Sequence, residues 1–142
     1  MTTPYGSVAG GDHIRQLPKR LALIGRGAGA AHDVRFKFYD DLATAKRAGK
    51  LRSVQLRVKL AFAESDFGRL RMSLNGQPLP IDRLSRADGF VTYSDPPLRR
   101  GSNSLVVLLE GVDNPTDWQK WPELQLVEVV VRYHSEKGYK SN

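Results

Sequence analysis

The strongest constraint on the fold is the alternation of apolar and polar residues over residues 53–63. Most of the odd-numbered residues are polar, and the even-numbered residues between them are all apolar: Val54, Leu56, Val58, Leu60 and Phe62. In a β-strand successive side chains point to opposite faces, so this segment has one face in a core and one in water. Strands of this kind are typical of antiparallel sheets, which the chain is therefore expected to form.

Other segments show the same period or a short apolar run. The predicted strands cover residues 21–24, 32–40, 69–74, 89–93, 105–109 and 124–133. Residues 105–109 are apolar on both faces, which places them in the middle of a sheet, whereas residues 21–24 suit an edge. Pro78 and Pro80 exclude a central strand over residues 77–84. Six to eight strands without an internal repeat predict an all-β fold, an antiparallel β-sandwich.

One short helix is predicted from Leu42 to Ala48. Asp40 and Asp41 precede it, cations stand in its last turn, and Gly49 follows as a stop signal. We expect this helix to cover one end of the sandwich.

The composition fits a single domain, since 40% of the 142 residues are hydrophobic. We expect residues 1–18 to be a flexible lead-in or an expression remnant, residues 19–134 the sandwich, and residues 135–142 a frayed tail. No apolar window is long enough to cross a bilayer, and the first eleven residues lack the pattern of a signal peptide. Cysteine is absent, which excludes disulfides and thiol chemistry.

A glycine-rich segment follows the first apolar run. Residues 25–31 match the pattern G-x-G-x-x-A, which in dinucleotide-binding folds joins a strand to a helix. The helix is needed there because its first N–H groups bind pyrophosphate. Here the glycines are followed by a segment in which apolar and polar residues alternate, as in a strand, and not by a helix. We therefore interpret the glycines as a loop between strands and expect no bound cofactor.

The chain carries few residues arranged for catalysis. Its histidines, His13, His32 and His134, stand far apart, and no G-x-S-x-G sequence is present. The carboxylates that could pair for glycoside cleavage all lie in turns or beside prolines, where turn chemistry accounts for them. They are Glu64, Asp66, Asp95, Asp113, Asp117 and Glu123. We therefore expect that the protein is not an enzyme.

Two predicted turns carry a resemblance to a known family. Asn75 and Gly76 predict a tight turn after a strand, and Leu98 opens the pattern L-x-x-G-x-N-x-L-x-V, in which Gly101 and Asn103 form a second turn. This arrangement resembles the galactose-binding-like jelly-roll β-sandwiches, which serve as carbohydrate-binding or accessory modules of bacterial glycoside hydrolases. The matching residues belong to turns and to the core, so no ligand-binding residue is carried over.

The resemblance implies a non-catalytic jelly roll with a carbohydrate ligand. It also implies a catalytic glycoside hydrolase domain as a partner in the same chain and an extracellular or cell-surface location in bacteria. Modules of this kind often hold a structural calcium ion, for which Asp40, Asp41 or Asp113 could supply oxygen ligands. The spacing of these residues matches no recognised calcium loop, so no metal is predicted.

Both tryptophans of the chain stand in the loop of residues 111–122, named here the Trp loop. An exposed indole can stack on the C–H face of a pyranose, and nearby polar groups can bind its hydroxyls. The predicted sugar-binding set is Trp118, Trp121, Tyr93, Asn114, Asp117 and Lys120. In the alternative interpretation, the two indoles fold back and cover one end of the sandwich.

The net charge of +7 points to a second candidate surface. Alternation places Arg57 and Lys59 outward on one strand, and Arg69 and Arg71 outward on the next. If these strands were neighbours, their cations would need an anion between them, such as a polyuronate or a sulfated glycan. We favour the alternative, in which the strands lie in different sheets and the cations solubilise the domain. No aromatic residue shares these outward positions, so we expect no nucleic acid partner.

The sequence thus predicts a non-catalytic carbohydrate-binding module that binds a neutral or anionic polysaccharide through the Trp loop. The alternative is a structural accessory β-sandwich that packs on a catalytic domain or a sister subunit without binding sugar. A third hypothesis is a polyanion-binding domain that uses the four outward cations and whose affinity falls steeply with salt.

Overall fold

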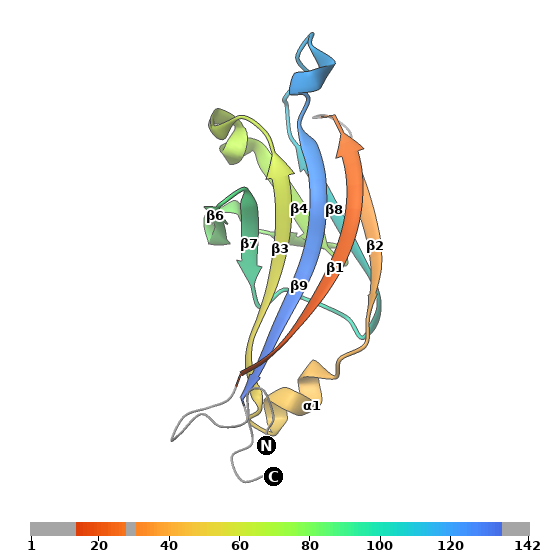
Figure 1. Ribbon diagram of the computed structural model, residues 1–142, viewed down its shortest axis with the longest axis vertical. Coiled ribbons are helices and arrows are strands. Elements are labelled where there is room, and N and C mark those ends of the chain that lie inside the picture. Colours follow the sequence, from red (N-terminus) through yellow and green to blue (C-terminus); the bar gives the residue numbers. More distant parts are fainter. Residues whose placement is uncertain (1–13, 28–30, 135–142) are drawn as a thin grey trace.

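The computed structural model describes residues 14–27 and 31–134, and for residues 14–26 it describes the backbone alone. Most of the predicted lead-in, the predicted tail, His13 and part of the glycine-rich segment lie outside the described residues. The described part of the chain forms two antiparallel sheets (Figure 1).

Sheet A has five strands and sheet B has four. The order in sheet A is β1 (Ile14–Arg26), β9 (Glu123–His134), β3 (Leu51–Ala61), β7 (Phe90–Ser94) and β6 (Leu84–Ala87). The order in sheet B is β2 (His32–Phe38), β8 (Gly101–Leu109), β4 (Leu70–Leu74) and β5 (Gln77–Leu79). Every pair of neighbouring strands is antiparallel, which confirms the predicted all-β class.

The inner faces of the two sheets share one hydrophobic core. The alternation in β3 buries Leu56 and Val58, and β8 contributes Leu105 and Val107 from the opposite sheet. Burying side chains of this size is the main stabilising term of such a fold, about 1.5–3 kcal/mol each. Because β8 lies between β2 and β4, the central position predicted for residues 105–109 is confirmed.

Strand β1 begins earlier than the sequence predicts. It pairs with β9 from Ile14 opposite His134 to Arg26 opposite Glu123, with one irregularity between Ala22 and Gly25. Residues 14–18, which were expected to belong to the lead-in, are therefore part of this strand. Long-range pairing with β9 outweighs the weak local pattern of this segment, and an edge strand tolerates its proline. The predicted edge position of residues 21–24 is confirmed.

Two short strands bring the total to nine in the part of the chain that the structure describes, one more than the predicted upper limit. These are β5 and β6, which lie in or beside the segment expected to be irregular. Each is the last strand of its sheet, and the 3-10 turn η2 (Ile81–Arg83) links them. Pro78 lies in β5, at a sheet edge where a missing N–H group is tolerated.

The predicted short helix is confirmed as α1 (Leu42–Arg47), at the lower end of the view in Figure 1. Asp41 caps it, because its carboxylate accepts hydrogen bonds from the backbone N–H of Thr44 at 3.1 Å and from the Thr44 hydroxyl at 2.8 Å. Gly49 ends the turn with a φ of 70°. No described helix combines the length and the apolar character that crossing a membrane requires.

The buried amide of Asn103 joins the two turns that carry the family resemblance. Asn75 and Gly76 have φ angles of 54° and 80°, as the two-residue hairpin between β4 and β5 requires. Asn103 is 2% exposed. Its Oδ1 accepts from the Arg99 N–H at 2.7 Å and from Asn75 Nδ2 at 2.9 Å. Its Nδ2 donates to the carbonyl oxygens of Arg99 at 2.9 Å and Gly101 at 3.1 Å. These residues therefore stabilise the fold.

Candidate functional site

The Trp loop joins β8 to β9 at the end of the sandwich opposite α1, where the blue turn projects at the top of Figure 1. Its centre is the 3-10 turn η3 (Trp118–Lys120). Asp117 caps this turn, since its Oδ1 accepts from the Gln119 N–H at 3.0 Å and its carbonyl oxygen accepts from the Lys120 N–H at 3.0 Å. The loop therefore holds a defined shape through its own hydrogen bonds.

The two indoles of the Trp loop have different surroundings. Trp118 is 57% exposed, one of two large hydrophobic residues that are exposed among the described residues. Trp121 is half-buried, and its Nε1–H donates to the carbonyl oxygen of Pro115 at 2.7 Å. The predicted platform thus fits Trp118, whereas the alternative of rings that fold back fits Trp121 in part.

Three predicted polar partners accompany Trp118. Asn114, Asp117 and Lys120 are all exposed on the Trp loop. The Asn114 amide lies beside Gly27, whose backbone N–H donates to the carbonyl oxygen of Pro122 at 3.0 Å. The structure therefore brings these polar groups and Trp118 to the same end of the sandwich.

Tyr93 does not join the Trp loop, so the structure does not bring it together with the other residues of the predicted sugar-binding set. It lies on β7, 6% exposed in the shared core, and the Arg83 guanidinium lies 5.3 Å from the centre of its ring. The physical reason is the period of the strand, which turns Val91 and Tyr93 together toward the core. That alternation was visible in the sequence and would have excluded Tyr93.

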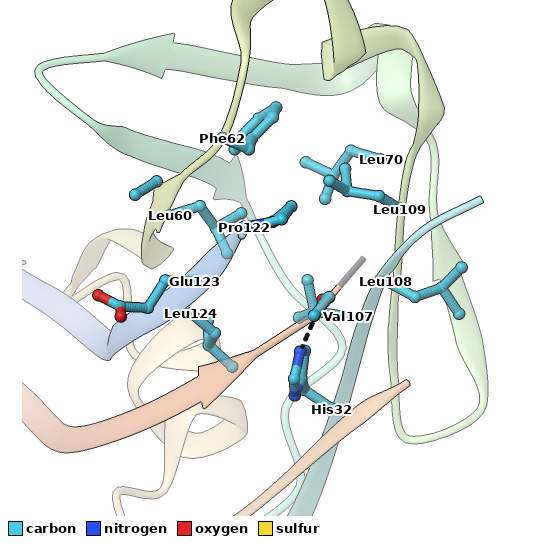
Figure 2. A pocket seen from close by; sticks show the side chains of 12 residues that line it. His32, Leu60, Phe62, Leu70, Val107, Leu108, Leu109, Pro122, Glu123 and Leu124 are labelled. Atoms are coloured by element: carbon cyan, nitrogen blue, oxygen red, sulfur yellow. Dashed lines mark hydrogen bonds between the residues drawn. The ribbon is translucent and has the colours of Figure 1, made fainter. Parts of the chain in front are cut away.

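A small cavity lies among residues from the ends of both sheets, beside Pro122 of the Trp loop (Figure 2). Most of its lining is apolar, including Leu60, Phe62 and Leu109. His32 is one polar member, and its Nε2 lies 3.2 Å from the carbonyl oxygen of Gly27, the dashed contact in Figure 2. The other, Glu123, accepts from Gln125 Nε2 at 2.8 Å. Both polar side chains therefore have partners, and the cavity extends the core.

The residues considered for catalysis are spread over the molecule. His32 opens β2 beside the cavity, whereas His134 ends β9, where its N–H donates to the carbonyl oxygen of Lys50 at 2.7 Å. Glu64 and Asp66 lie in the 3-10 turn η1 (Glu64–Arg69). No group of three His, Asp or Glu residues in the described ranges is arranged to hold a metal ion.

The acidic pair considered for calcium is engaged in structural contacts. Asp40 Oδ2 accepts from the Tyr133 hydroxyl at 3.0 Å. The pKa of the Asp41 carboxyl lies below its ordinary value, first because of the hydrogen bonds from the Thr44 backbone and hydroxyl, and further because Arg100 and Arg47 lie nearby. These carboxylates stabilise the start of α1 and the end of β9.

The four predicted outward cations do not form one basic face. Arg57 and Lys59 lie on β3 in sheet A, Arg71 lies on β4 in sheet B, and Arg69 ends η1. The favoured alternative, that the strands lie in different sheets, is confirmed. Arg71 also forms an ion pair, with its Nε 3.2 Å from Oε1 of Glu110.

Glu128 is a buried charge that the sequence analysis missed. It is 1% exposed on β9, directly opposite Arg57, and Arg57 Nη1 lies 2.7 Å from its Oε1. The same guanidinium lies 4.1 Å from the centre of the Phe90 ring. A lone acid within the valine-rich run of residues 127–131 was the available signal. Arg57 is thus held in the fold and is a poor candidate for binding a ligand.

Comparisons of this chain with known protein families, with curated proteins and with solved structures found no match. The functional argument therefore depends on the geometry of the Trp loop and of the surfaces around it.

Proposed function

We propose that the protein is a non-catalytic carbohydrate-binding module in which a pyranose ring stacks on Trp118. The observation that carries this proposal is the 57% exposure of that indole on a loop shaped by its own hydrogen bonds. A ring held in a fixed loop loses little conformational freedom on binding, which favours affinity. Its flat apolar face suits the C–H face of a sugar.

The polar groups of the Trp loop favour a neutral glycan at this site. Asp113 and Asp117 supply two negative charges, and Lys120 supplies one positive charge. Asn114 adds an amide that can both donate and accept hydrogen bonds. Together these groups can bind sugar hydroxyls, while the excess of carboxylates disfavours a polyuronate beside Trp118.

The position of the Trp loop also suits a binding module. Ile14 and His134 are paired, so β1 starts and β9 ends near α1, at the end of the sandwich opposite Trp118 (Figure 1). The described strands β1 and β9 thus leave the end that carries the Trp loop uncovered, which suits binding of a polysaccharide there.

The strand order supports the finer proposal of a jelly roll. The first four strands alternate between the sheets, and β8 in sheet B is followed by β9 in sheet A between β1 and β3. Connections that cross between two sheets in this way are the feature of a jelly roll. With that topology, the resemblance to galactose-binding-like modules extends the proposal to a catalytic glycoside hydrolase domain as partner and to an extracellular setting.

The test is isothermal calorimetry or affinity electrophoresis with a panel of neutral glycans. We expect Trp118→Ala to weaken binding by about fivefold or more, because stacking on one aromatic ring contributes about 1–3 kcal/mol where it has been measured with nucleic-acid bases. Tyr39→Ala is the matched control, since Tyr39 is 58% exposed at the opposite end of the sandwich. Equal binding by the wild type and Trp118→Ala, or no binding to any neutral glycan, would refute the proposal.

The alternative function is a structural accessory domain, and one observation favours it. A groove lies on the outer face of sheet B, with Val106, Leu108, Pro78 and Ile81 among its lining. A catalytic domain or sister subunit that covered these apolar side chains would gain buried area. Failure of every glycan in the panel would favour this function.

A further inference from the structure

The second exposed large hydrophobic residue, Tyr39, lies at the opposite end of the sandwich from Trp118. It directly follows β2 and is 58% exposed. Its carbonyl oxygen accepts a hydrogen bond from Arg100 Nε at 3.0 Å. This bond fixes the base of the guanidinium and leaves its two Nη groups available, next to an exposed aromatic ring.

A second arginine is tied to the same segment. Arg47 Nη2 donates to the Thr44 hydroxyl at 3.2 Å, and that hydroxyl donates to Asp41 Oδ2 at 2.8 Å. Arg100 is bonded to the Tyr39 carbonyl, two residues before Asp41, and the charges of both arginines lower the pKa of the Asp41 carboxyl. Both carboxylate oxygens of Asp41 already accept hydrogen bonds from Thr44. The ion pairs found among the described residues include neither Arg47 nor Arg100.

Lys37 adds a third cation. It is exposed on β2, two residues before Tyr39 and on the same outward side of the strand. Lys37, Arg47 and Arg100 thus supply three cations on the segments next to Tyr39, against the two carboxylates of Asp40 and Asp41. We call Lys37, Tyr39, Arg47 and Arg100 the Tyr39 corner.

Structural roles account for part of this set. Lys37 protects the free edge of β2 against pairing with another strand, and Arg47 complements the dipole at the end of α1. Neither role explains the ring of Tyr39 or the orientation of Arg100 by the Tyr39 carbonyl. These two features need a different reason.

We propose that the Tyr39 corner is a second glycan site, which binds an acidic pyranose unit of a polysaccharide. The sugar ring stacks on Tyr39, and its carboxylate or sulfate group accepts hydrogen bonds from the free Nη groups of Arg100 and from Arg47. Planar guanidinium groups suit such oxyanions because two N–H groups can bind two oxygens at once. The site is independent of the one proposed at Trp118.

The surroundings favour a sugar over other polyanions. Single-stranded nucleic acids stack successive bases on several aromatic side chains, whereas Tyr39 is the one exposed aromatic residue in the corner. A stable protein interface has a fully buried apolar centre, and the corner offers charged side chains around a single ring. One ring with three cations suits a single acidic sugar unit.

The test measures dissociation constants by calorimetry at low ionic strength, with an oligogalacturonide as the carboxylate probe and a heparin oligosaccharide as the sulfate probe. We expect Arg100→Gln to weaken binding of at least one probe about tenfold, and Tyr39→Ala about fivefold. Tyr39→Ala keeps the backbone carbonyl that orients Arg100, and the exposed ring is not needed for folding, so its melting temperature should match the wild type.

Two controls separate this site from net charge and from the Trp loop. Arg69→Gln removes an exposed charge near the other end, and Trp118→Ala removes the other ring; each should change the affinity less than twofold. An equal loss in Arg69→Gln and Arg100→Gln would overturn the proposal. So would equal affinity for a single-stranded oligonucleotide, or failure of both acidic probes to bind. The probe that binds decides between a carboxylate and a sulfate.

Discussion

The strongest structural prediction concerns the buried amide of Asn103. We predict that Asn103→Ala lowers the free energy of unfolding by about 3 kcal/mol. The four hydrogen bonds of this side chain contribute about 1 kcal/mol each, and they are not additive because they share two turns. The substitution also leaves the N–H of Arg99 and the carbonyl of Gly101 without this partner in a partly buried position.

Urea unfolding followed by circular dichroism measures this change. In a domain of this size about 3 kcal/mol corresponds to a fall of about 10 °C in melting temperature. Ser102→Ala is the control, because Ser102 is exposed beside the same turn. A loss below about 1 kcal/mol for Asn103→Ala would refute the proposed role of the amide.

Asn103→Asp tests the direction of the hydrogen bonds. The aspartate keeps the acceptor Oδ1 but turns the Nδ2 donor into an oxygen, which then faces the carbonyl oxygens of Arg99 and Gly101. Burial and these carbonyls raise the pKa of the introduced carboxyl in the folded state. A raised folded pKa means that stability is present at low pH and is lost as pH rises through that pKa. Equal stability at pH 4 and pH 7 would contradict this account.

Three further predictions concern the fold. Glu128→Ala should lower the unfolding free energy by about 2 kcal/mol in urea, because Arg57 loses its carboxylate but remains one-third exposed and can hydrate; an unchanged midpoint would contradict this. Gly76→Ala should cost about 1 kcal/mol because φ is 80°, although nothing lies within 4 Å of the added methyl group, whereas Gly68→Ala, equally open and without positive φ, should not. Asp41→Asn should keep the cap of α1 but remove the pH dependence of the stability that the cap contributes. The folded pKa of Asp41 lies below 3.8, so its carboxylate stabilises the wild type above that pH. This stabilisation is lost as the pH falls through the folded pKa. An unchanged acid profile of the melting temperature would oppose it.

Local patterns in the sequence predicted the inward faces of the strands but not their neighbours. Alternation identifies Leu56 and Val58 as core residues because the period of a strand depends on its own backbone. The neighbour of β3 in the sheet, by contrast, is set by long-range pairing with β9. Arg57 on β3 and Glu128 on β9 lie opposite each other although 71 residues separate them in the chain. For this reason the sequence left open whether the outward cations met, and the burial of Glu128 went unnoticed.

The candidate site was predictable as a loop but not as a surface. Two tryptophans in the Trp loop favour a stacking site, yet their exposure depends on contacts within the loop. The Nε1–H of Trp121 donates a hydrogen bond to the Pro115 carbonyl oxygen, while Trp118 lies in η3 and is 57% exposed. Tyr39 was also beyond prediction, because the contact of its carbonyl oxygen with Arg100, 61 residues away in the chain, depends on the pairing of β2 with β8.

The two exposed rings permit a decisive comparison, because they lie at opposite ends of the same sandwich in opposite charge settings. Trp118 has an excess of carboxylates in its loop, and Tyr39 has an excess of cations around it. If each binds its own glycan, Trp118→Ala should weaken binding of neutral glycans alone and Tyr39→Ala should weaken binding of acidic glycans alone. A single site cannot produce that crossed pattern. If both variants weakened the same ligand equally, the cause would be a change in the fold, and both sites would have to be abandoned.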